Sequence, residues 1–520
     1  EASMLPALTL IKANPAVVNE VWASLGLLHY TARFRLYGAW KEALGSLTAP
    51  LLAAATKVTQ VETRKIMRRL SKENIKEFGR KLGKVAHADP LTVTTTILSQ
   101  IEVYSNMIQP VVDAMKYFTM MGYDVLTYLV IVNLGGRGQL QKLKNDGMNV
   151  SLWLSSLASF CGYLTRKYTG VELTALIQLL VNKLKDSQSI DLLVLKEVIG
   201  RMTGVEILQN MSNDQISASA GGDTLRGEAL TFDKSGSAKS LAKGAVRLKE
   251  AMLVESDPLL SALVVLVAQQ RTSIIYNTET PHLKLMGSLY DNCQETMVQL
   301  MEFLGSTVTS VSEYATIMPA LADMVRKYRL EPEAVFLIYQ PVFKTLALTP
   351  VPRAAAEGDT EQQKKRNATA LSVGPVKHTW DELMKITADL LPASTWNCLS
   401  PELYFTFWSL SLYDLHVPKE RYNLEIRKQQ SAIQGIEDGR GGLDASKARK
   451  EKERLSGIVE KLKDELAAQT KHVAAVEKRL IAEKDSWLLN YSAELRPETM
   501  VQLLQTCILP RVMFTYTDAV

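Results

Sequence analysis

Apolar residues recur at intervals of three and four along most of the chain, which places them on one face of a helix. Clear examples are the series Ile97, Ile101, Tyr104 and Ile108, and the series Leu283, Met286, Leu289, Tyr290 and Cys293. No segment alternates convincingly between apolar and polar residues, and Asn-Gly or Asp-Gly hairpin signals are nearly absent. The pattern therefore predicts an all-α protein.

The predicted helices are closely spaced but follow no fixed sequence period. One helix pair cannot bury its apolar face alone, so neighbouring pairs stack into an extended array. At 520 residues, the chain also exceeds the roughly 250–300 residues that one hydrophobic core serves. We predict an irregular helical-repeat solenoid of the HEAT or armadillo kind, with regions 1–110, 111–345 and 374–520.

Three stretches interrupt the helical pattern. Residues 212–245 are rich in Gly, Ser, Asp and Lys, so we expect a long loop that could hold short helices. Residues 346–373 contain Pro350, Pro352 and a charged run, so we expect a flexible linker. Glycines between residues 435 and 446 mark a third break.

A long charged helix is predicted at about 447–487. Its apolar positions keep three–four spacing with one stutter, and they form a seam at Leu455, Ile458, Leu462, Leu466, Val473, Val476 and Leu480. Such a seam can pair with a helix of the same chain or of a partner. We take Leu462, Leu466, Val473 and Val476 as candidate subunit-interface residues.

A dense aromatic cluster is a second candidate interface. Only 7% of the chain is aromatic, yet five aromatic residues gather at Tyr404, Phe405, Phe407, Trp408 and Tyr413. At helical spacing such a cluster more often forms a core or a subunit interface than a platform for stacking bases. We favour core or interface by about three to one.

The net charge of +5 is small for this length, so any nucleic-acid binding must rest on a local patch. Residues 57–84 hold ten Lys or Arg residues and three Glu residues. If this segment is one continuous helix, basic residues every four positions form a stripe that attracts phosphates. A merely solvated helix face has about even odds. The candidate RNA- or helicase-binding residues are Arg64, Lys65, Arg68, Arg69, Lys72, Lys76, Arg80, Lys81 and Lys84.

Catalytic signatures fail throughout the sequence. The nearest approach to a phosphate loop, Gly79–Lys84, is one residue short between its glycines and is followed by Val85 where Ser or Thr must reach magnesium. The six histidines show no metal-ligand spacing, and the four distant cysteines read as buried residues of an intracellular protein. We expect no enzymatic activity, no cofactor and no metal.

No membrane span is expected either. The apolar segment 259–268 is far shorter than the ~20 residues that cross a bilayer, and it suits a core helix. The chain begins at Glu1 and stops within a helical pattern, so we expect an internal fragment of a longer protein.

Several runs of residues are distinctive, and they are Asn14–Trp22, Tyr30–Gly38, Ile66–Asn74, Trp153–Gly162, Tyr404–Leu410 and Cys507–Arg511. In this order they resemble the family of large scaffold subunits of the THO complex. The resemblance covers nearly the whole chain and is weak at the expected loop and linker.

The resemblance implies a nuclear scaffold that assembles the other THO subunits and couples transcription to mRNA packaging and export. It implies recruitment of the DEAD-box RNA helicase of the export pathway. Part of the array is then expected to be similar to the middle domain of translation-initiation scaffolds, a kind of domain that commonly clasps a DEAD-box ATPase. Such a protein would act by binding and orienting its partners.

Three rival hypotheses stay open at this point. The chain could bind RNA directly through the basic segment, alone or together with a helicase role. It could instead be a cytoplasmic scaffold of the translation-initiation kind. An enzyme with a composite active site is the least favoured hypothesis.

Overall fold

A computed structural model describes residues 4–45, 50–205, 212–229, 238–254, 259–277, 282–308, 310–346, 372–373, 376–377, 380–438, 445–488 and 497–514. The chain forms two compact units. Unit 1 comprises Glu1–Thr203 and Ala238–Thr296, and unit 2 comprises Gly204–Ser237 and Met297–Val520. These units divide the chain at other positions than the three predicted regions.

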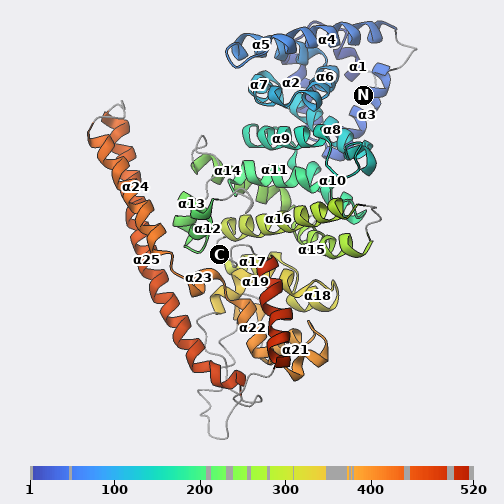
Figure 1. The fold of residues 1–520 in the computed structure, drawn as a ribbon. Helices are drawn as coiled ribbons and strands as arrows, with labels where there is room; N and C mark the ends of the chain where they lie inside the picture. The colour runs from blue at the N-terminus through green and yellow to red at the C-terminus, as the bar shows by residue number, and fades with distance from the viewer. Residues whose placement is uncertain are drawn as a thin grey trace. The chain divides into compact units, whose positions relative to one another are not determined.

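Unit 1 is a stack of helices in successive layers (Figure 1). Its α-helices are α1 (Met4–Leu8), α2 (Pro15–Leu25), α3 (Tyr30–Gly45), α4 (Pro50–Arg69), α5 (Ile75–Ala88), α6 (Pro90–Val103), α7 (Ile108–Ala114), α8 (Met120–Gly136), α9 (Leu152–Lys167), α10 (Leu173–Lys185), α11 (Leu192–Thr203), α14 (Ala238–Met252), α15 (Leu259–Asn277) and the first half of α16 (Leu283–Thr307). Short 3₁₀ turns are η1 (Ser105–Met107), η2 (Met115–Tyr117) and η3 (Gln139–Lys142).

Local sequence explains where several of these helices begin. Asn14 precedes Pro15, and its side chain accepts a hydrogen bond from the backbone N–H of Ala16. Asp89 precedes Pro90 in the same way and accepts from Thr92. A capping side chain satisfies an otherwise orphaned N–H group, and proline fits the first helical turn because its missing N–H would have no partner there.

Helices α9 and α11 approach each other closely at Gly162. A Cβ atom at this position would lie 2.8 Å from the backbone oxygen of Glu197 and 2.9 Å from Cγ of Arg201. Only glycine leaves room for this contact, so the pairing of the two helices depends on it.

A buried ion pair joins α3 to α8. Arg33 Nε donates to Asp124 at 2.8 Å, and the two side chains are 8% and 2% exposed. Tyr37 also donates to Asp124 at 2.8 Å. Removing one partner of such a pair would leave an uncompensated buried charge, which is strongly destabilising.

Unit 2 contains the second half of α16 and the later helices. These are α12 (Asn213–Ser219), α13 (Asp223–Ala229), α17 (Val311–Ile317), α18 (Leu321–Arg326), α19 (Pro332–Leu346), α21 (Trp380–Ala388), α22 (Pro401–Ser409), α23 (Leu412–Leu415), α24 (Lys419–Glu437), α25 (Ala445–Leu488), α26 (Pro497–Leu503) and α27 (Leu509–Phe514). A 3₁₀ helix, η5, spans Ala393–Asn397, and a π-helical segment, η6, spans Leu504–Ile508. A two-residue antiparallel pair, β1 (Ser372–Val373) and β2 (Val376–Lys377), is the sheet in the described part.

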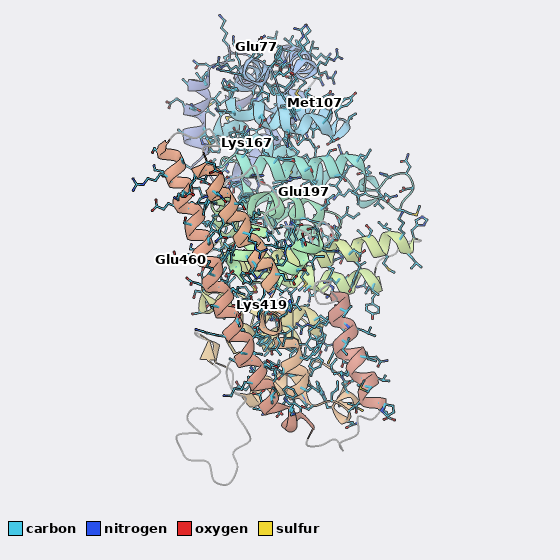
Figure 2. All side chains as sticks on the ribbon, turned by 60° about the vertical axis from the view of Figure 1, so that its left-hand side comes forward. Glu77, Met107, Lys167, Glu197, Lys419 and Glu460 are labelled. Atoms are coloured by element: carbon cyan, nitrogen blue, oxygen red, sulfur yellow. The ribbon has the colours of Figure 1, made fainter. Side chains whose placement is uncertain are left out.

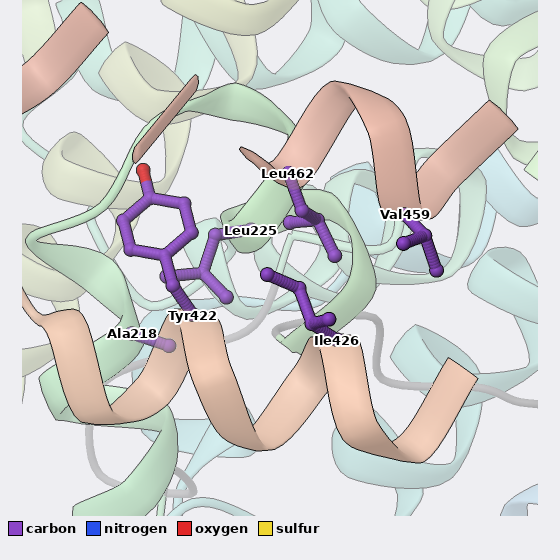
Figure 3. Close-up of a cluster of buried hydrophobic side chains, with 6 residues drawn as sticks. All are labelled: Ala218, Leu225, Tyr422, Ile426, Val459 and Leu462. Atoms are coloured by element: carbon purple, nitrogen blue, oxygen red, sulfur yellow. The ribbon is translucent and has the colours of Figure 1, made fainter. Parts of the chain in front are cut away.

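Helices α24 and α25 lie antiparallel as one long hairpin (Figure 1). Two short helices from a distant part of the sequence, α12 and α13, pack onto it. The shared cluster buries Ala218, Leu225, Tyr422, Ile426, Val459 and Leu462 (Figure 3). Burial of this apolar surface provides the main force that holds the four helices together.

The all-α prediction and the helical-repeat fold class are confirmed. The long charged helix expected at 447–487 is α25, which spans 44 residues. The segment 212–245 was expected to be a long loop that could hold short helices. Its described residues form the short helices α12 and α13 and the first half of the longer α14, so helix is more extensive there than expected. Ser212 and Gln215 form a capping box that starts α12, and Ala218 and Leu225 become buried against the hairpin. The expected linker at 346–373 lies almost wholly outside the described residues.

Helix α15 has 19 residues and is long and apolar enough to cross a membrane. The apolar segment 259–268, considered by itself, is too short to do so. Of the apolar window of α15, 56% is buried. Leu260, Leu263 and Val267 are each 0% exposed. This burial is the pattern of a core helix.

Substitution of Gly162 by alanine tests the α9–α11 contact. The added methyl group must displace backbone, so we expect unit 1 to lose about 1–3 kcal/mol of stability. The change should appear as faster hydrogen exchange in peptides from α9 and α11.

Gly287→Ala in α16 is the matched control. No atom lies within 4 Å of the added Cβ, so this helical glycine should gain about 0.5–1 kcal/mol on replacement. Equal exchange in the two variants would show that the close contact at Gly162 contributes nothing.

Candidate interaction surfaces

The basic segment is not one continuous helix, so the predicted stripe needs correction. Helix α4 ends at Arg69 and α5 begins at Ile75. Asn74 closes the turn between them: its side chain accepts from the N–H of Ser71 at 2.8 Å and donates to the carbonyl of Arg69 at 2.6 Å. Leu70 is 6% exposed, and its burial bends the chain inward.

The structure nevertheless leaves the basic residues outside. All nine candidates, defined here as the basic surface, are exposed: Arg64, Lys65, Arg68, Arg69, Lys72, Lys76, Arg80, Lys81 and Lys84. Lys81 pairs with Glu77 at 2.6 Å, and the side chains around Glu77 project outward from α5 (Figure 2). The other eight form no ion pair with any described residue. Most of the charge is therefore uncompensated.

Two glycines on the opposite side of α5 explain this orientation. A Cβ atom at Gly83 would lie 2.7 Å from Cβ of Tyr117 and 2.8 Å from its carbonyl oxygen. At Gly79 the corresponding distance to the Tyr117 ring is 3.1 Å. The glycines of the phosphate-loop candidate therefore serve close helix packing against η2, and they turn the charged face of α5 toward solvent.

Aromatic rings support two of the cations. The Arg80 guanidinium lies 5.9 Å from the centroid of Tyr117, and the Lys81 ammonium lies 4.7 Å from that of Phe78. Both rings are half-buried. Such contacts attract the cation electrostatically and limit its motion.

The aromatic cluster of unit 2 is a core. Tyr404, Phe405 and Trp408 are at most 5% exposed, and their ring centroids lie 5.9–6.0 Å from that of Phe336 on α19. Burial strongly raises the pKa of Tyr404. Of the two alternatives, core or interface, the structure supports the core for these three residues.

The other two aromatic candidates are half-buried and also contact unit 2. The Phe407 ring lies 5.2 Å from the Arg511 guanidinium. The Tyr413 ring lies 5.3 Å from that of His472 on α25. Neither residue forms a free aromatic patch.

The seam of α25 likewise pairs within the chain. Leu462 and Val476 are 0% exposed. Leu466 packs on the cluster shown in Figure 3, and Val473 is half-buried. These four candidates therefore do not form an exposed subunit interface in the described unit, because α13, α23 and α24 cover the seam.

Gln469, on the same side of α25, forms a buried hydrogen-bond network that is not among the predicted sites. We call this network the latch. Gln469 is 0% exposed. Its Oε1 accepts from the Tyr422 hydroxyl at 2.9 Å. Its Nε2 lies 2.8 Å from the carbonyl oxygen of Ala220 and 3.0 Å from that of His416. One side chain thus joins α25 to α24, α12 and the end of α23.

Glu465, one turn earlier, extends this latch. Its carboxylate accepts from the backbone N–H groups of Thr224 at 2.8 Å and Leu225 at 3.0 Å. These are N–H groups in the first turn of α13, so a residue about 240 positions away caps that helix. A Cβ at Gly222 would lie 2.4 Å from the carboxyl carbon of Glu465, so the glycine leaves room for the cap.

His472 completes the polar side of α25. Its Nε2 lies 2.8 Å from Oδ1 of Asp414, which is 0% exposed. Oδ2 of Asp414 accepts from the backbone N–H of Ser411 at 2.7 Å. A signal for the latch existed in the sequence, because Gln469 stands where three–four spacing predicts an apolar residue.

No group of described residues could hold a metal ion through three or more His, Cys, Asp or Glu side chains. Gly79–Lys84 lies within α5 and forms no phosphate loop.

Comparison with known proteins gives three matching family models. Residues 1–80 match the model of the THO complex subunit 2 N-terminus. Residues 82–158 match a transcription- and export-related complex subunit, and residues 396–520 match a transcription factor/nuclear export subunit protein 2.

Curated relatives match almost the whole chain. THO complex subunit 2 of Arabidopsis thaliana is 41% identical over 533 residues, covering 99% of this chain and 29% of the relative. The Homo sapiens protein of that name is 37% identical over 519 residues, covering 99% and 32%. That of Saccharomyces cerevisiae is 22% identical over 520 residues, covering 99% and 29%.

The chain belongs to the THO complex subunit 2 family. The predicted family is thereby confirmed. The chain spans 29% to 32% of the length of these relatives. None of the family models or relatives above is described as an enzyme.

Replacement of Gln469 by alanine tests the latch in this member of the THO complex subunit 2 family. The change leaves the Tyr422 hydroxyl without its acceptor and buried carbonyl groups without the amide donor. We therefore expect a loss of about 1–3 kcal/mol in the unfolding free energy of unit 2. Urea unfolding of the chain, followed by the change in tryptophan fluorescence to which the buried Trp408 of unit 2 contributes, would measure this loss.

Gln430→Ala on α24 is the control, because Gln430 is exposed and lies on the same hairpin. A surface change of this kind is expected to stay within about 0.5 kcal/mol. Equal stability of the two variants would contradict the latch.

Thiol labelling provides a second test of the fold. Burial raises the pKa of Cys161 and Cys293 to about 12 and that of Cys507 to about 11. These thiols stay protonated and enclosed near pH 8, whereas Cys398 is only half-buried. Because the thiolate is the reactive form, we expect a disulfide reagent to modify Cys398 alone before unfolding.

The variant Cys398→Ser should then show no labelling under native conditions. Fast labelling of any other cysteine in that variant would contradict the packing described here.

Proposed function

We propose that this chain is a segment of a nuclear scaffold subunit that organises the other THO subunits and recruits and orients a DEAD-box RNA helicase. In this role it takes part in mRNA packaging and export during transcription. The observation that carries the proposal is the match of 99% of the chain to proteins named THO complex subunit 2. The names of two family models, which refer to export and transcription, support the same process.

The architecture fits a protein that acts by holding partners in place. Two stacks of helices bury their apolar faces internally, and their outer faces are rich in charge. A scaffold needs elements that keep their geometry under load. The hairpin α24–α25 has this property, because the apolar cluster and the Gln469 latch join it to α12, α13 and α23. Satisfied buried polar networks make such a junction rigid.

A rigid framework can change helicase activity without any chemistry of its own. A partner that binds one conformation of a two-lobed ATPase more tightly than another shifts its population toward the first. The coupling free energy for such effects corresponds to about 5- to 150-fold changes in equilibrium binding affinity. In this proposal the chain is not an enzyme, and it uses no cofactor and no membrane.

The competing cytoplasmic scaffold would use a similar helical framework. The description of one matching family model favours the nuclear role, since it refers to nuclear export, and the relatives' names refer to the THO complex. Fractionation of cells that express the full-length protein separates the two: a cytoplasmic pool alone would contradict the nuclear role.

Co-purification with the helicase of the export pathway tests the proposal directly. We expect this chain to retain the helicase and to change its RNA-stimulated ATP turnover by at least about fivefold. The chain alone should hydrolyse no ATP, and detectable turnover would revive the enzyme hypothesis.

Gln469→Ala and Gln430→Ala separate the hairpin's role from general folding in this assay. If the rigid hairpin orients the helicase, only the first variant should weaken the change in turnover. A chain that retains neither the helicase nor another THO subunit would contradict the proposal.

A further inference from the structure

The outer face of α5 carries charge and nothing else. Its exposed side chains are Lys76, Glu77, Arg80, Lys81 and Lys84. Protein–protein interfaces generally bury apolar anchors and are depleted in Lys. The outer face of α5 offers no such anchor, so its composition suits a polyanion better than a folded protein.

The end of α4 and the following turn continue the charge. Arg64, Lys65, Arg68, Arg69 and Lys72 are exposed. The exposed apolar residues of α4, Leu51, Val58 and Val61, all precede this part of the helix. The nine cations of the basic surface therefore lie between residues 64 and 84, where Glu73 and Glu77 are the exposed acidic residues.

The spacing of the cations follows from the helix. Lys76, Arg80 and Lys84 are separated by four residues each, which advances about 6 Å along the axis per step. A row of this kind presents successive cations to a linear chain of negative groups. Each cation that meets a phosphate releases a condensed counterion, and this release drives binding without sequence preference.

Two features reduce the cost of ordering these side chains. Arg80 rests on the Tyr117 ring, and Lys81 lies between Phe78 and Glu77. The close packing of Gly79 and Gly83 against Tyr117 holds the helix that carries these two cations in place. Side chains that are already restricted lose less entropy on binding.

We propose that the basic surface of α4 and α5 is a binding site for the phosphate backbone of single-stranded RNA. The site recognises charge and not base sequence. It acts in the chain alone and does not depend on the proposed contact with a helicase.

The test measures binding of the whole chain to a uridine oligonucleotide of about 16 residues by fluorescence anisotropy at about 50 and 200 mM salt. The test variant combines Arg68→Gln, Lys72→Gln, Lys76→Gln and Lys84→Gln. The cations that lie on the Tyr117 and Phe78 rings, Arg80 and Lys81, are left in place. Folding should therefore be kept, and circular dichroism checks this. We expect affinity at low salt to fall at least about tenfold.

The salt dependence gives the more specific readout. For single strands each lost phosphate contact reduces the slope of log affinity against log salt by about 0.7. The four substitutions should therefore flatten the slope by roughly 2 to 3. A random-sequence oligonucleotide should bind as the uridine oligonucleotide does.

The control variant removes the same charge elsewhere in unit 1 through Lys12→Gln, Lys41→Gln, Lys144→Gln and Lys185→Gln, four exposed lysines. It should keep most of the affinity and the slope. Equal losses in both variants would overturn the site, since only net charge would then matter. Unchanged RNA binding in the test variant, with loss of the helicase or of another THO subunit, would assign the surface to a protein.

Discussion

The close packing of α5 against Tyr117 determines which side of this helix is buried and which side faces water. Gly79 and Gly83 allow the helix backbone to reach the ring and the carbonyl group of Tyr117. With that side of the helix buried, the charged residues at four-residue spacing have only solvent to face. The same physical rule acts throughout both units, because each helix must bury one apolar face and so commits the opposite one to water or to a partner.

Unit 2 adds a polar constraint to this rule. The hairpin α24–α25 uses a mainly apolar seam, but Gln469 interrupts it at a position with no access to water. The cost of burying the amide is offset because Tyr422 and several backbone carbonyls supply its hydrogen bonds. Only one register of the hairpin aligns these groups, so the latch adds specificity to the packing that the apolar cluster provides.

The fold class and the family could be predicted from the sequence, since three–four spacing and ordered runs of residues are local features. The long helix α25 was predicted within a few residues of its ends for the same reason. The features that the sequence does not predict depend on contacts between residues that are distant in the sequence. The polar composition around α12 and α13 predicts only a loop that could hold short helices, because these two helices bury apolar residues through contact with the hairpin. The break after Arg69 depends on the burial of Leu70 and on hydrogen bonds from Asn74.

The candidate sites show the same division. The exposed cations can be identified from charge alone. The seam and aromatic residues cannot be assigned from sequence in this way, because a core and a subunit interface use the same apolar and aromatic side chains. The structure assigns Leu462, Val476 and the buried aromatic residues to the interior of unit 2. These residues are therefore not free to form a subunit interface, whereas eight of the nine cations of the basic surface are exposed without an ion pair to a described residue.

The most direct measurement is ultraviolet cross-linking of RNA to the full-length subunit within the assembled THO complex, with the linked peptides identified by mass spectrometry. The account predicts that cross-links occur in peptides spanning residues 64–84 and on the adjoining Tyr117. Efficient cross-linking of the complex with every linked peptide of this chain outside those positions would contradict it.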